Sequence, residues 1–415
     1  MTSSFAPALN SAAALDAADP LASYREHFVH SDSREILSYL DGNSLGRPLA
    51  ATAGKMKEFI DGEWGTRLIR SWDESWMQEP FEVGDRLGDV VLGAAPGQTV
   101  VADSTSVMLY KLLRGAMTGR PGRDEIVVDR ENFPSDRFLV EGIAAELGTT
   151  IRWIEPDPAG GVSADEVRQV VGPRTAVVLL SHVAYRSGFL ADAPAITKIV
   201  HDAGALVLWD LCHSVGSVPL QLDAWGVDLA VGCTYKYLNG GPGAPAFAYV
   251  RSDLQRQLQQ PLWGWMSARD PFGMTAEYRP ADDMRRFLTG TPPILAMQPL
   301  KHMLDLIARA GIEAIREKSV LLTERAITLY DEILAPLGVE LTSPRDCAKR
   351  GSHVTIDHPC FREVVALLWE RGVVPDFRAP RGLRIGLSPL STSFAELEAG
   401  VAAIRDALIE VLRGR

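Results

Sequence analysis

Two short apolar runs, Ala205-Leu206-Val207-Leu208-Trp209-Asp210 and Leu229-Ala230-Val231-Gly232-Cys233-Thr234-Tyr235-Lys236, each lead to a charged side chain. Lys236 lies 26 residues after Asp210 (236 − 210). Short, continuous apolar runs of this kind are typical of strands buried in a parallel α/β sheet. Active groups collect at the carboxyl ends of such strands. We therefore expect Asp210 and Lys236 at the same edge of a sheet.

A glycine-rich run, Gly240-Gly241-Pro242-Gly243, follows Lys236 closely. Glycine lets the backbone approach another group closely. A strand-end lysine beside such a run suits a Schiff base, and a carboxylate on a neighbouring strand suits a pyridinium nitrogen. Together they indicate pyridoxal phosphate (PLP). The alternative, a buried Lys–Asp pair that only joins two strands, does not explain the flanking Tyr235 and the glycines.

Apolar runs alternate with helical patterns from about residue 90 onward, which predicts an α/β fold with a mostly parallel central sheet flanked by helices. One helical pattern has apolar residues at i, i+3, i+4, i+7 and i+8 from Leu109. Capping-box sequences at Ser163–Glu166 and Ser393–Glu396 predict two helix starts. The strand candidates are residues 126–128, 151–154, 176–180, 205–209, 229–233 and 246–250.

The pattern changes near residue 297, where two long helical stretches begin, separated by Gly311. Strand-like pieces and a final helix follow, typical of a smaller C-terminal α+β domain. We expect an N-terminal arm and helix over 1–50, a large PLP-binding domain over 51–297 and a small domain over 298–415.

Composition narrows the class of protein. The chain of 415 residues is 46% hydrophobic and 23% charged, as in soluble globular enzymes, and its net charge is −11. That charge argues against binding to nucleic acid or to an anionic membrane. No apolar run approaches the roughly 20 residues that a membrane-spanning helix needs. The four cysteines form no C-x-x-C pair, so we expect no metal site. Four cysteines in a chain of this length fit a reducing compartment, and we expect a cytoplasmic location.

Three further groups are candidates for the site. Asp103-Ser104-Thr105-Ser106 precedes the helix at Leu109, and its hydroxyls and free N–H groups suit a phosphate, although ordinary helix capping is the commoner use. Phe133 can stack on a flat ring or can precede a helix that starts at Pro134. Arg384, in a half-buried strand pattern, requires an anion, which can be a substrate carboxylate or an internal acid.

His213 and Tyr235 lie next to the two charged residues in sequence. His213, three residues after Asp210, can line the ring or serve a structural role. Tyr235 can bond a phosphate or act as an acid, but as a strand residue it would point away from Lys236 unless the chain turns there.

These residues resemble the kynureninase family of PLP enzymes of fold type I, the aspartate-aminotransferase fold. The most specific block is Thr234-Tyr235-Lys236-Tyr237-Leu238-Asn239-Gly240-Gly241-Pro242-Gly243. Supporting segments are residues 39–46, 132–136, 208–214, 289–294 and 349–354.

The resemblance implies a role for each matching position. Lys236 would carry the cofactor, Asp210 would hold the pyridinium nitrogen, and Tyr235 would serve the phosphate. Tyr235 is also our candidate for the catalytic acid. The other cofactor-binding positions would be Thr105, Ser106 and Trp265 at the phosphate, Phe133, Ser135 and Asp136 at the ring, Ser181 and His213 along the pocket, and Thr291 across a dimer interface. Substrate-binding positions would be Asn43, Ser44, Trp64 and Arg384, with Arg384 at the α-carboxylate.

Two positions depart from the family pattern. Ala184 replaces an asparagine in the run His182-Val183-Ala184-Tyr185, and Ala268 lies where the family has a histidine soon after the tryptophan that matches Trp265. The cofactor positions match, whereas positions expected near an aryl group do not.

The resemblance implies hydrolytic cleavage of the Cβ–Cγ bond of L-kynurenine or 3-hydroxykynurenine by a homodimer with shared active sites. It also implies a place in tryptophan catabolism and NAD biosynthesis. One alternative is a homologue that acts on a modified kynurenine in secondary metabolism. Others are a cysteine desulfurase, for which Cys347 is the only weak nucleophile candidate, an aminotransferase, or a non-catalytic binding protein.

Overall fold

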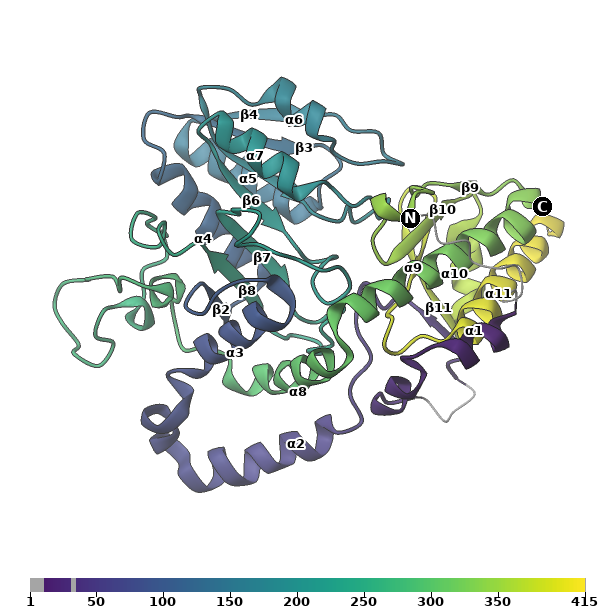
Figure 1. Cartoon of the computed structure of the whole chain (residues 1–415), viewed down its shortest axis with the longest axis horizontal. Helices are drawn as coiled ribbons and strands as arrows, with labels where there is room; N and C mark the ends of the chain where they lie inside the picture. The colour runs from purple at the N-terminus through teal and green to yellow at the C-terminus, as the bar shows by residue number, and fades with distance from the viewer. Residues whose placement is uncertain (1–10, 31–34, 415) are drawn as a thin grey trace.

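Seven strands form the central sheet of the larger lobe, in the order β2-β8-β7-β6-β5-β3-β4 (Figure 1). The structure is a computed structural model that describes residues 11–30 and 35–414, so the predicted N-terminal arm and helix over residues 1–50 lie partly outside the described residues. Only β8 runs antiparallel to its neighbours, which confirms the predicted α/β fold with a mostly parallel sheet. The strands are β2 (Thr99–Ala102), β3 (Glu125–Asp129), β4 (Thr150–Ile154), β5 (Thr175–Ser181), β6 (Leu206–Asp210), β7 (Leu229–Cys233) and β8 (Ala246–Val250).

Successive side chains of these strands enter two different cores, as the pleat of a strand requires. In β5, Val178 and Leu180 join one core, whereas Val177 and Leu179 join the other. Both faces are therefore covered, and the central strands are buried along their whole length. Only the edge strand β4 alternates between exposed and half-buried residues.

Helices on the two faces follow from this division. One face is covered by α4 (Thr105–Thr118) and α5 (Pro134–Leu147). The other face is covered by α3 (Glu79–Leu87), α6 (Ala164–Val170), α7 (Ala193–Asp202) and α8 (Ile294–Ala310). The predicted capping box at Ser163 is present at the start of α6. Before α3, α2 (Thr52–Phe59) and short helical turns form an arm along the lower edge of Figure 1.

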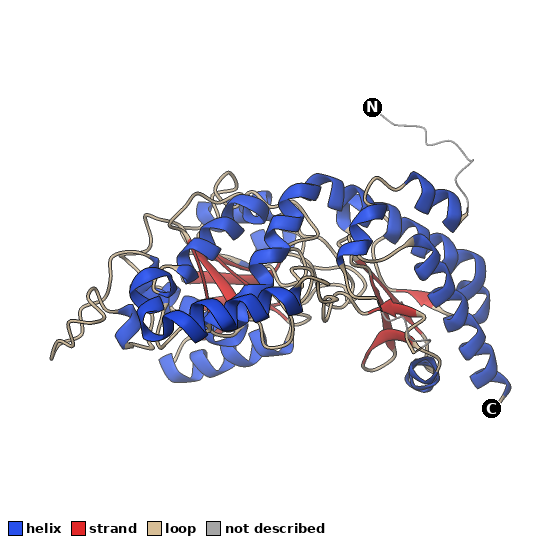
Figure 2. Cartoon of the chain, turned by 90° about the horizontal axis from the view of Figure 1, so that it is seen from below, coloured by secondary structure: helices blue, strands red, loops and turns tan. Residues whose placement is uncertain are grey.

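A second sheet forms the smaller lobe, in the order β1-β11-β12-β10-β9 (Figure 2). Its strands are β1 (Ser38–Leu40), β9 (Glu340–Leu341), β10 (His353–Asp357), β11 (Val373–Arg378) and β12 (Gly382–Gly386). Helices α9 (Ile312–Leu329), α10 (Phe361–Glu370) and α11 (Phe394–Arg413) pack on it in a separate core. Within the described residues, no helix is both long enough and apolar enough to cross a bilayer.

The N-terminal segment packs on this smaller lobe. Helix α1 (Ala12–Ala18) lies beside α11, and β1 pairs in parallel with β11. Asp16 accepts hydrogen bonds of 3.0 Å from Phe394 N and Ala395 N at the start of α11. Asp19 and Lys318 form a buried ion pair of 2.7 Å. The division at residues 50 and 297 stays a prediction, and α8 extends from Ile294 across the second of these positions.

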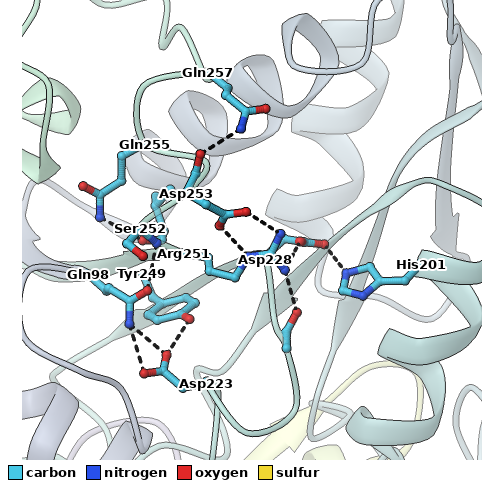
Figure 3. Close-up of polar contacts among 12 residues, drawn as sticks. Gln98, His201, Asp223, Asp228, Tyr249, Arg251, Ser252, Asp253, Gln255 and Gln257 are labelled. Carbon is cyan, nitrogen blue, oxygen red and sulfur yellow. Dashed lines mark hydrogen bonds and ion pairs between the residues drawn. The ribbon is translucent and has the colours of Figure 1, made fainter.

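Polar side chains close the amino edge of the large sheet (Figure 3). Asp228, at the start of β7, is 1% exposed. It accepts hydrogen bonds from Val207 N at 2.9 Å and from His201 Nε2 at 2.8 Å, and it pairs with Arg251 at 2.9 Å. Asp223 accepts hydrogen bonds from Ala95 N, Gln98 Nε2 and Tyr249 Oη.

Candidate active site

Asp210 and Lys236 lie at the carboxyl edge of the large sheet, as predicted. Strand β6 ends at Asp210, and its parallel neighbour β7 ends three residues before Lys236. Both side chains are buried, with 6% of Asp210 and 8% of Lys236 exposed. Because the chain turns after Cys233, Tyr235 does not have to point away from Lys236, and its ring centroid lies 6.0 Å from Lys236 Nζ.

The Lys236 amine contacts His213. Lys236 Nζ lies 3.2 Å from His213 Nε2. Burial, with the nearby charges of Lys236 and Arg384, holds the pKa of His213 well below its usual range. His213 is therefore neutral, and its Nε2 accepts the hydrogen bond that Lys236 donates. The ring of Phe133 lies 5.8 Å from the same Nζ, so an aromatic face borders the amine.

Only one oxygen of the Asp210 carboxylate accepts a short hydrogen bond. Its Oδ1 accepts a hydrogen bond of 2.8 Å from Cys212 N, whereas its Oδ2 is 3.5 Å from Ser181 Oγ. Ser181 is in register with Asp210 on β5, and it donates a better hydrogen bond of 2.9 Å to Asn132 Oδ1. Oδ2 thus retains the capacity to accept from a protonated ring nitrogen.

Asp136 provides a second buried acid, in the first turn of α5. It is 3% exposed, and its Oδ2 has no hydrogen-bond partner within the described residues. Burial, with repulsion from Asp210 and Asp129, raises the pKa of Asp136 well above its usual range. Burial and the two neighbouring carboxylates together oppose the ionised form of Asp136.

The start of α4 has the features of a phosphate cradle. Ser104 is the N-cap, yet its side chain makes no capping hydrogen bond, so the first N–H groups of this 14-residue helix stay available beside Thr105 and Ser106. Asp103, held at φ +50°, directs its carboxylate to the buried Lys111 Nζ at 2.6 Å. That ion pair neutralises the one acid next to the helix start.

Tyr235 remains a proton donor in this setting. Burial, with nearby Cys233 and Cys212, raises the pKa of its phenol above its usual range. The group therefore keeps its proton throughout the physiological pH range and can give it to a group that becomes more basic during a reaction.

The smaller lobe contributes Arg384 from β12, and it is 1% exposed. Arg384 Nε donates to Asp376 Oδ2 at 2.6 Å, Nη1 donates to the Tyr185 carbonyl at 2.8 Å and Nη2 donates to Ser44 Oγ at 2.9 Å. Of the two anions that the sequence allowed for Arg384, a substrate carboxylate or an internal acid, the internal acid is present as Asp376. Asn43 is fully buried, and among the described residues neither polar atom of its side chain has a hydrogen-bond partner.

His353 and Asp376 belong to this group but were missed from the sequence. The His353 ring, from β10, lies 5.6 Å from the His213 ring and is fully buried. Burial and the charges of Arg384 and Lys236 lower its pKa well below the usual range, so it is neutral. A lone histidine or aspartate in a strand gives no sequence signal of its own, and only the tertiary structure brings them here.

Three predicted residues lie on the surface of the single chain. Trp64 is 51% exposed on the arm after α2, Trp265 is 40% exposed with an edge contact to Phe272, and Thr291 is exposed just before α8. Within the described residues, none of the three makes a hydrogen bond or ring contact with Lys236, Asp210 or Arg384. Their predicted roles require another surface to meet them.

The two residues that depart from the family pattern, Ala184 and Ala268, lie in different parts of the large lobe. Ala184 follows β5, next to Tyr185, and its N–H donates a hydrogen bond of 2.9 Å to the Phe189 carbonyl. Ala268 lies on the loop with Trp265 and lines a surface pocket of about 340 Å³ with Trp263 and Tyr278.

The cysteines offer no separate centre in the part of the chain that the structure describes. All four are free thiols. Among residues 11–30 and 35–414, no three His, Cys, Asp or Glu side chains form a group that could hold a metal ion. Cys347 is half-buried in a short turn of the smaller lobe, where its carbonyl accepts a hydrogen bond from Arg316.

Comparison with known proteins gives consistent matches. Residues 90–374 match the family described as aminotransferase class-V. The chain is 42% identical over 404 residues to a kynureninase of Burkholderia pseudomallei (strain 1106a), covering 96% of this chain and 94% of the relative. It is also 42% identical over 396 residues to a kynureninase of Pseudomonas fluorescens, covering 94% and 92%.

Solved structures share the fold at lower identity. The apo cysteine desulfurase of Thermococcus onnurineus NA1 has a TM-score of 0.77 at 20% identity, covering 90% of this chain and 95% of that chain. A mutant of C-DES, with glycine linked covalently to its PLP cofactor, has a TM-score of 0.79 at 19% identity, covering 89% and 96%. These likenesses show the fold alone. The two kynureninases, matched at 42% identity over nearly the whole chain, show that this chain belongs to the kynureninase family of PLP-dependent, fold-type-I enzymes.

Proposed function

We propose that this protein is a PLP-dependent kynureninase. It hydrolyses the Cβ–Cγ bond of L-kynurenine or 3-hydroxykynurenine and releases anthranilate or 3-hydroxyanthranilate together with L-alanine. The observation that carries the proposal is the 42% identity over 96% of the chain, with Lys236 and Asp210 present at adjoining strand ends.

The residues at the carboxyl edge fit PLP. Lys236 would be the covalent attachment point and Asp210 would hold the ring nitrogen. Phe133, Ser135 and Asp136 would lie at the ring, and Ser181 and His213 would line the pocket. Thr105, Ser106, Tyr235 and the α4 N-terminus would hold the phosphate. When bound, PLP supplies an electron sink for carbanion chemistry at the substrate α-carbon.

Proton transfer is the work of the protein side chains. The Lys236 amine would take the α-proton of the substrate, and His213 Nε2, which lies 3.2 Å from Lys236 Nζ, would orient that amine. Tyr235 is the acid during activation of the γ-carbonyl toward water, since burial keeps its phenol protonated. Asp136 supplies a further proton donor at the ring side of the pocket.

Arg384 binds the substrate α-carboxylate, with Asn43 and Ser44 beside it. Buried polar atoms without partners are rare in folded proteins, and each calls for an explanation. The uncommitted amide of Asn43 finds that explanation in a polar ligand next to Arg384.

The active form in this proposal is a cytoplasmic homodimer that serves tryptophan catabolism. Trp64, Trp265 and Thr291 are exposed in one chain, and a second copy brings them to the shared site. Exposed apolar side chains near Trp265 support such an interface, since large exposed apolar areas mark contacts. They are Trp263, Phe272 and Met274, which are 64%, 53% and 73% exposed.

The direct test is incubation of the PLP-loaded protein with L-kynurenine and with 3-hydroxykynurenine. We expect equimolar release of the aryl acid and L-alanine, and we expect Asp210→Ala to bind PLP weakly and to be nearly inactive. A protein that binds PLP but releases neither product from either compound would contradict the proposed substrate class. Cleavage of only a ring-substituted kynurenine would instead support the homologue of secondary metabolism, which the departures at Ala184 and Ala268 leave as the second candidate.

A further inference from the structure

The donors of the Arg384 guanidinium are divided between two sides. Asp376 Oδ2 lies 2.6 Å from Nε and 2.6 Å from Nη2, so this carboxylate occupies the side of the guanidinium that these two nitrogens form. A guanidinium has five N–H donors, one on Nε and two on each Nη. The Tyr185 carbonyl takes one donor of Nη1, and the neutral Ser44 hydroxyl faces one donor of Nη2.

The side of Arg384 that Nη1 and Nη2 form has no acid among its hydrogen-bond partners in the described residues. Nη1 donates to the Tyr185 carbonyl, and Nη2 faces the neutral Ser44 hydroxyl. A planar carboxylate can take two parallel N–H groups at such an edge. The Ser44 hydroxyl can also donate its own proton to an incoming oxygen.

Asp376 is itself held in place. It is directly opposite Arg384 in the β11–β12 pair, and Arg378 Nε donates to the same Oδ2 at 2.7 Å. The Asp376 side chain is 15% exposed, and that of Arg384 is 1% exposed. A charge-assisted contact at this burial fixes the orientation of a long side chain that has many rotamers.

We propose that Asp376 is a positioning residue for the substrate: it holds the Nε side of Arg384 and thereby directs the Nη1–Nη2 edge toward the α-carboxylate. This inference rests on the proposed function only in that Arg384 binds the α-carboxylate of an amino acid. Asp376 makes no contact with the substrate. It acts by keeping this edge of Arg384 in one orientation before the ligand arrives.

The inference makes a prediction that a merely structural role does not. Loss of Asp376 should weaken ligands that carry an α-carboxylate and should spare ligands that lack the negative charge. The probes are L-alanine and its neutral isostere L-alaninamide, each titrated into PLP-loaded protein and followed by the change in cofactor absorbance. Neither probe requires cleavage of kynurenine.

For Asp376→Asn we expect the apparent Kd of L-alanine to rise about tenfold or more, and that of L-alaninamide to change less than twofold. Asp376→Glu keeps the charge but displaces it by one methylene, so its Kd for L-alanine should lie between those of the wild type and Asp376→Asn. The matched control is Asp228→Asn, which removes a buried, arginine-paired carboxylate at the opposite edge of the large sheet and should alter neither Kd.

Equal weakening of both probes, or an unchanged Kd for L-alanine, would overturn the positioning role. Arg384→Lys separates the two proposals. If it weakens L-alanine while Asp376→Asn does not, only the role of Asp376 is wrong. If kynurenine is not cleaved but the selective loss of L-alanine binding appears, the proposed substrate is wrong and the role of Asp376 stands.

Discussion

The two edges of the seven-stranded sheet differ in how their buried acids are paired. At the amino edge, Asp228 is surrounded by a backbone N–H, a histidine and an arginine, and Asp223 has three donors, two of which, Gln98 and Tyr249, are drawn in Figure 3. At the carboxyl edge, Asn132 Nδ2 and Asp136 Oδ2 are buried without a hydrogen-bond partner among the described residues. In the part of the chain that the structure describes, the side chains of Asn43 and His353 in the smaller lobe also lack hydrogen-bond partners.

This difference indicates that the buried acids of the amino edge stabilise the fold, whereas the buried polar groups of the carboxyl edge serve ligand binding. A buried acid that is fully paired stabilises the fold, and its removal leaves uncompensated partners. A buried polar group without a partner costs free energy in the free protein, and a ligand can recover that cost. The amino edge should therefore respond to mutation with loss of stability, and the carboxyl edge with loss of binding and turnover.

The largest expected effect is at Lys236. Lys236→Ala should lower kcat by about 10²–10⁴-fold or more, because the covalent attachment point and the base for the α-proton are lost together. Borohydride reduction followed by peptide mass spectrometry should find PLP on Lys236 in the wild type and on no peptide of the variant. Cofactor on another lysine of the wild type would contradict this assignment. The thermal unfolding midpoint of the apo protein should change little.

The second prediction addresses the amino edge. Asp228→Ala should lower the free energy of unfolding by about 3 kcal/mol, because it leaves Val207 N and Arg251 without their buried acceptor. Urea denaturation at fixed protein concentration measures this change, and kcat/KM of the folded protein should stay within twofold of the wild type. A large fall in kcat/KM with unchanged stability would remove the distinction between the two edges.

The third prediction concerns pH and Asp41, which lies two residues before Asn43. Burial raises the pKa of Asp41 to about 6, and its Oδ1 has no hydrogen-bond partner within the described residues. Because the folded-state pKa exceeds the unfolded one, the folded state binds more protons between pH 4 and pH 6, and stability falls as pH rises through this window. The contribution of Asp41 is up to about 3 kcal/mol, from about 1.4 kcal/mol per pKa unit.

Asp41→Asn should reduce this fall in the apo protein, measured by urea denaturation at pH 4.5 and pH 7.0. Asp331→Asn is the control, because Asp331 is an exposed acid paired with Arg345 in the same lobe. An unchanged difference between the two pH values in Asp41→Asn would show that Asp41 is ionised across this range.

The smallest expected effect is a change in substrate preference. Ala184→Asn and Ala268→His together should alter the ratio of kcat/KM for 3-hydroxykynurenine and kynurenine, by about tenfold, since they restore hydrogen-bonding side chains at positions expected near the aryl ring. A pocket that hydrogen-bonds a polar ring group discriminates more strongly between two substrates than an apolar pocket does, so the added polar side chains should change the ratio. Each single variant serves as the control for the other. A ratio that stays the same in the double variant would place both residues away from the ring.

Much of the large lobe was predictable from the chain alone. Apolar runs bounded by turns predicted β3 to β8, and the 3.6-residue pattern predicted α4. Asp210 and Lys236 were predictable as a pair because the carboxyl ends of parallel strands share an edge. The phosphate-binding role of Thr105 and Ser106 stays a prediction, and it follows from a local rule, since every helix start exposes free N–H groups.

The tertiary structure alone decided the other side of the site. Nothing local indicates that Ser38 pairs beside Val373, that Ser44 meets Arg384, or that His353 meets His213. These contacts join segments that are far apart in the chain or on different lobes, and they depend on how the two cores dock. Local periodicity reports which face of an element is buried. It does not report which distant residue completes the contact, because that choice is made by the packing of whole elements.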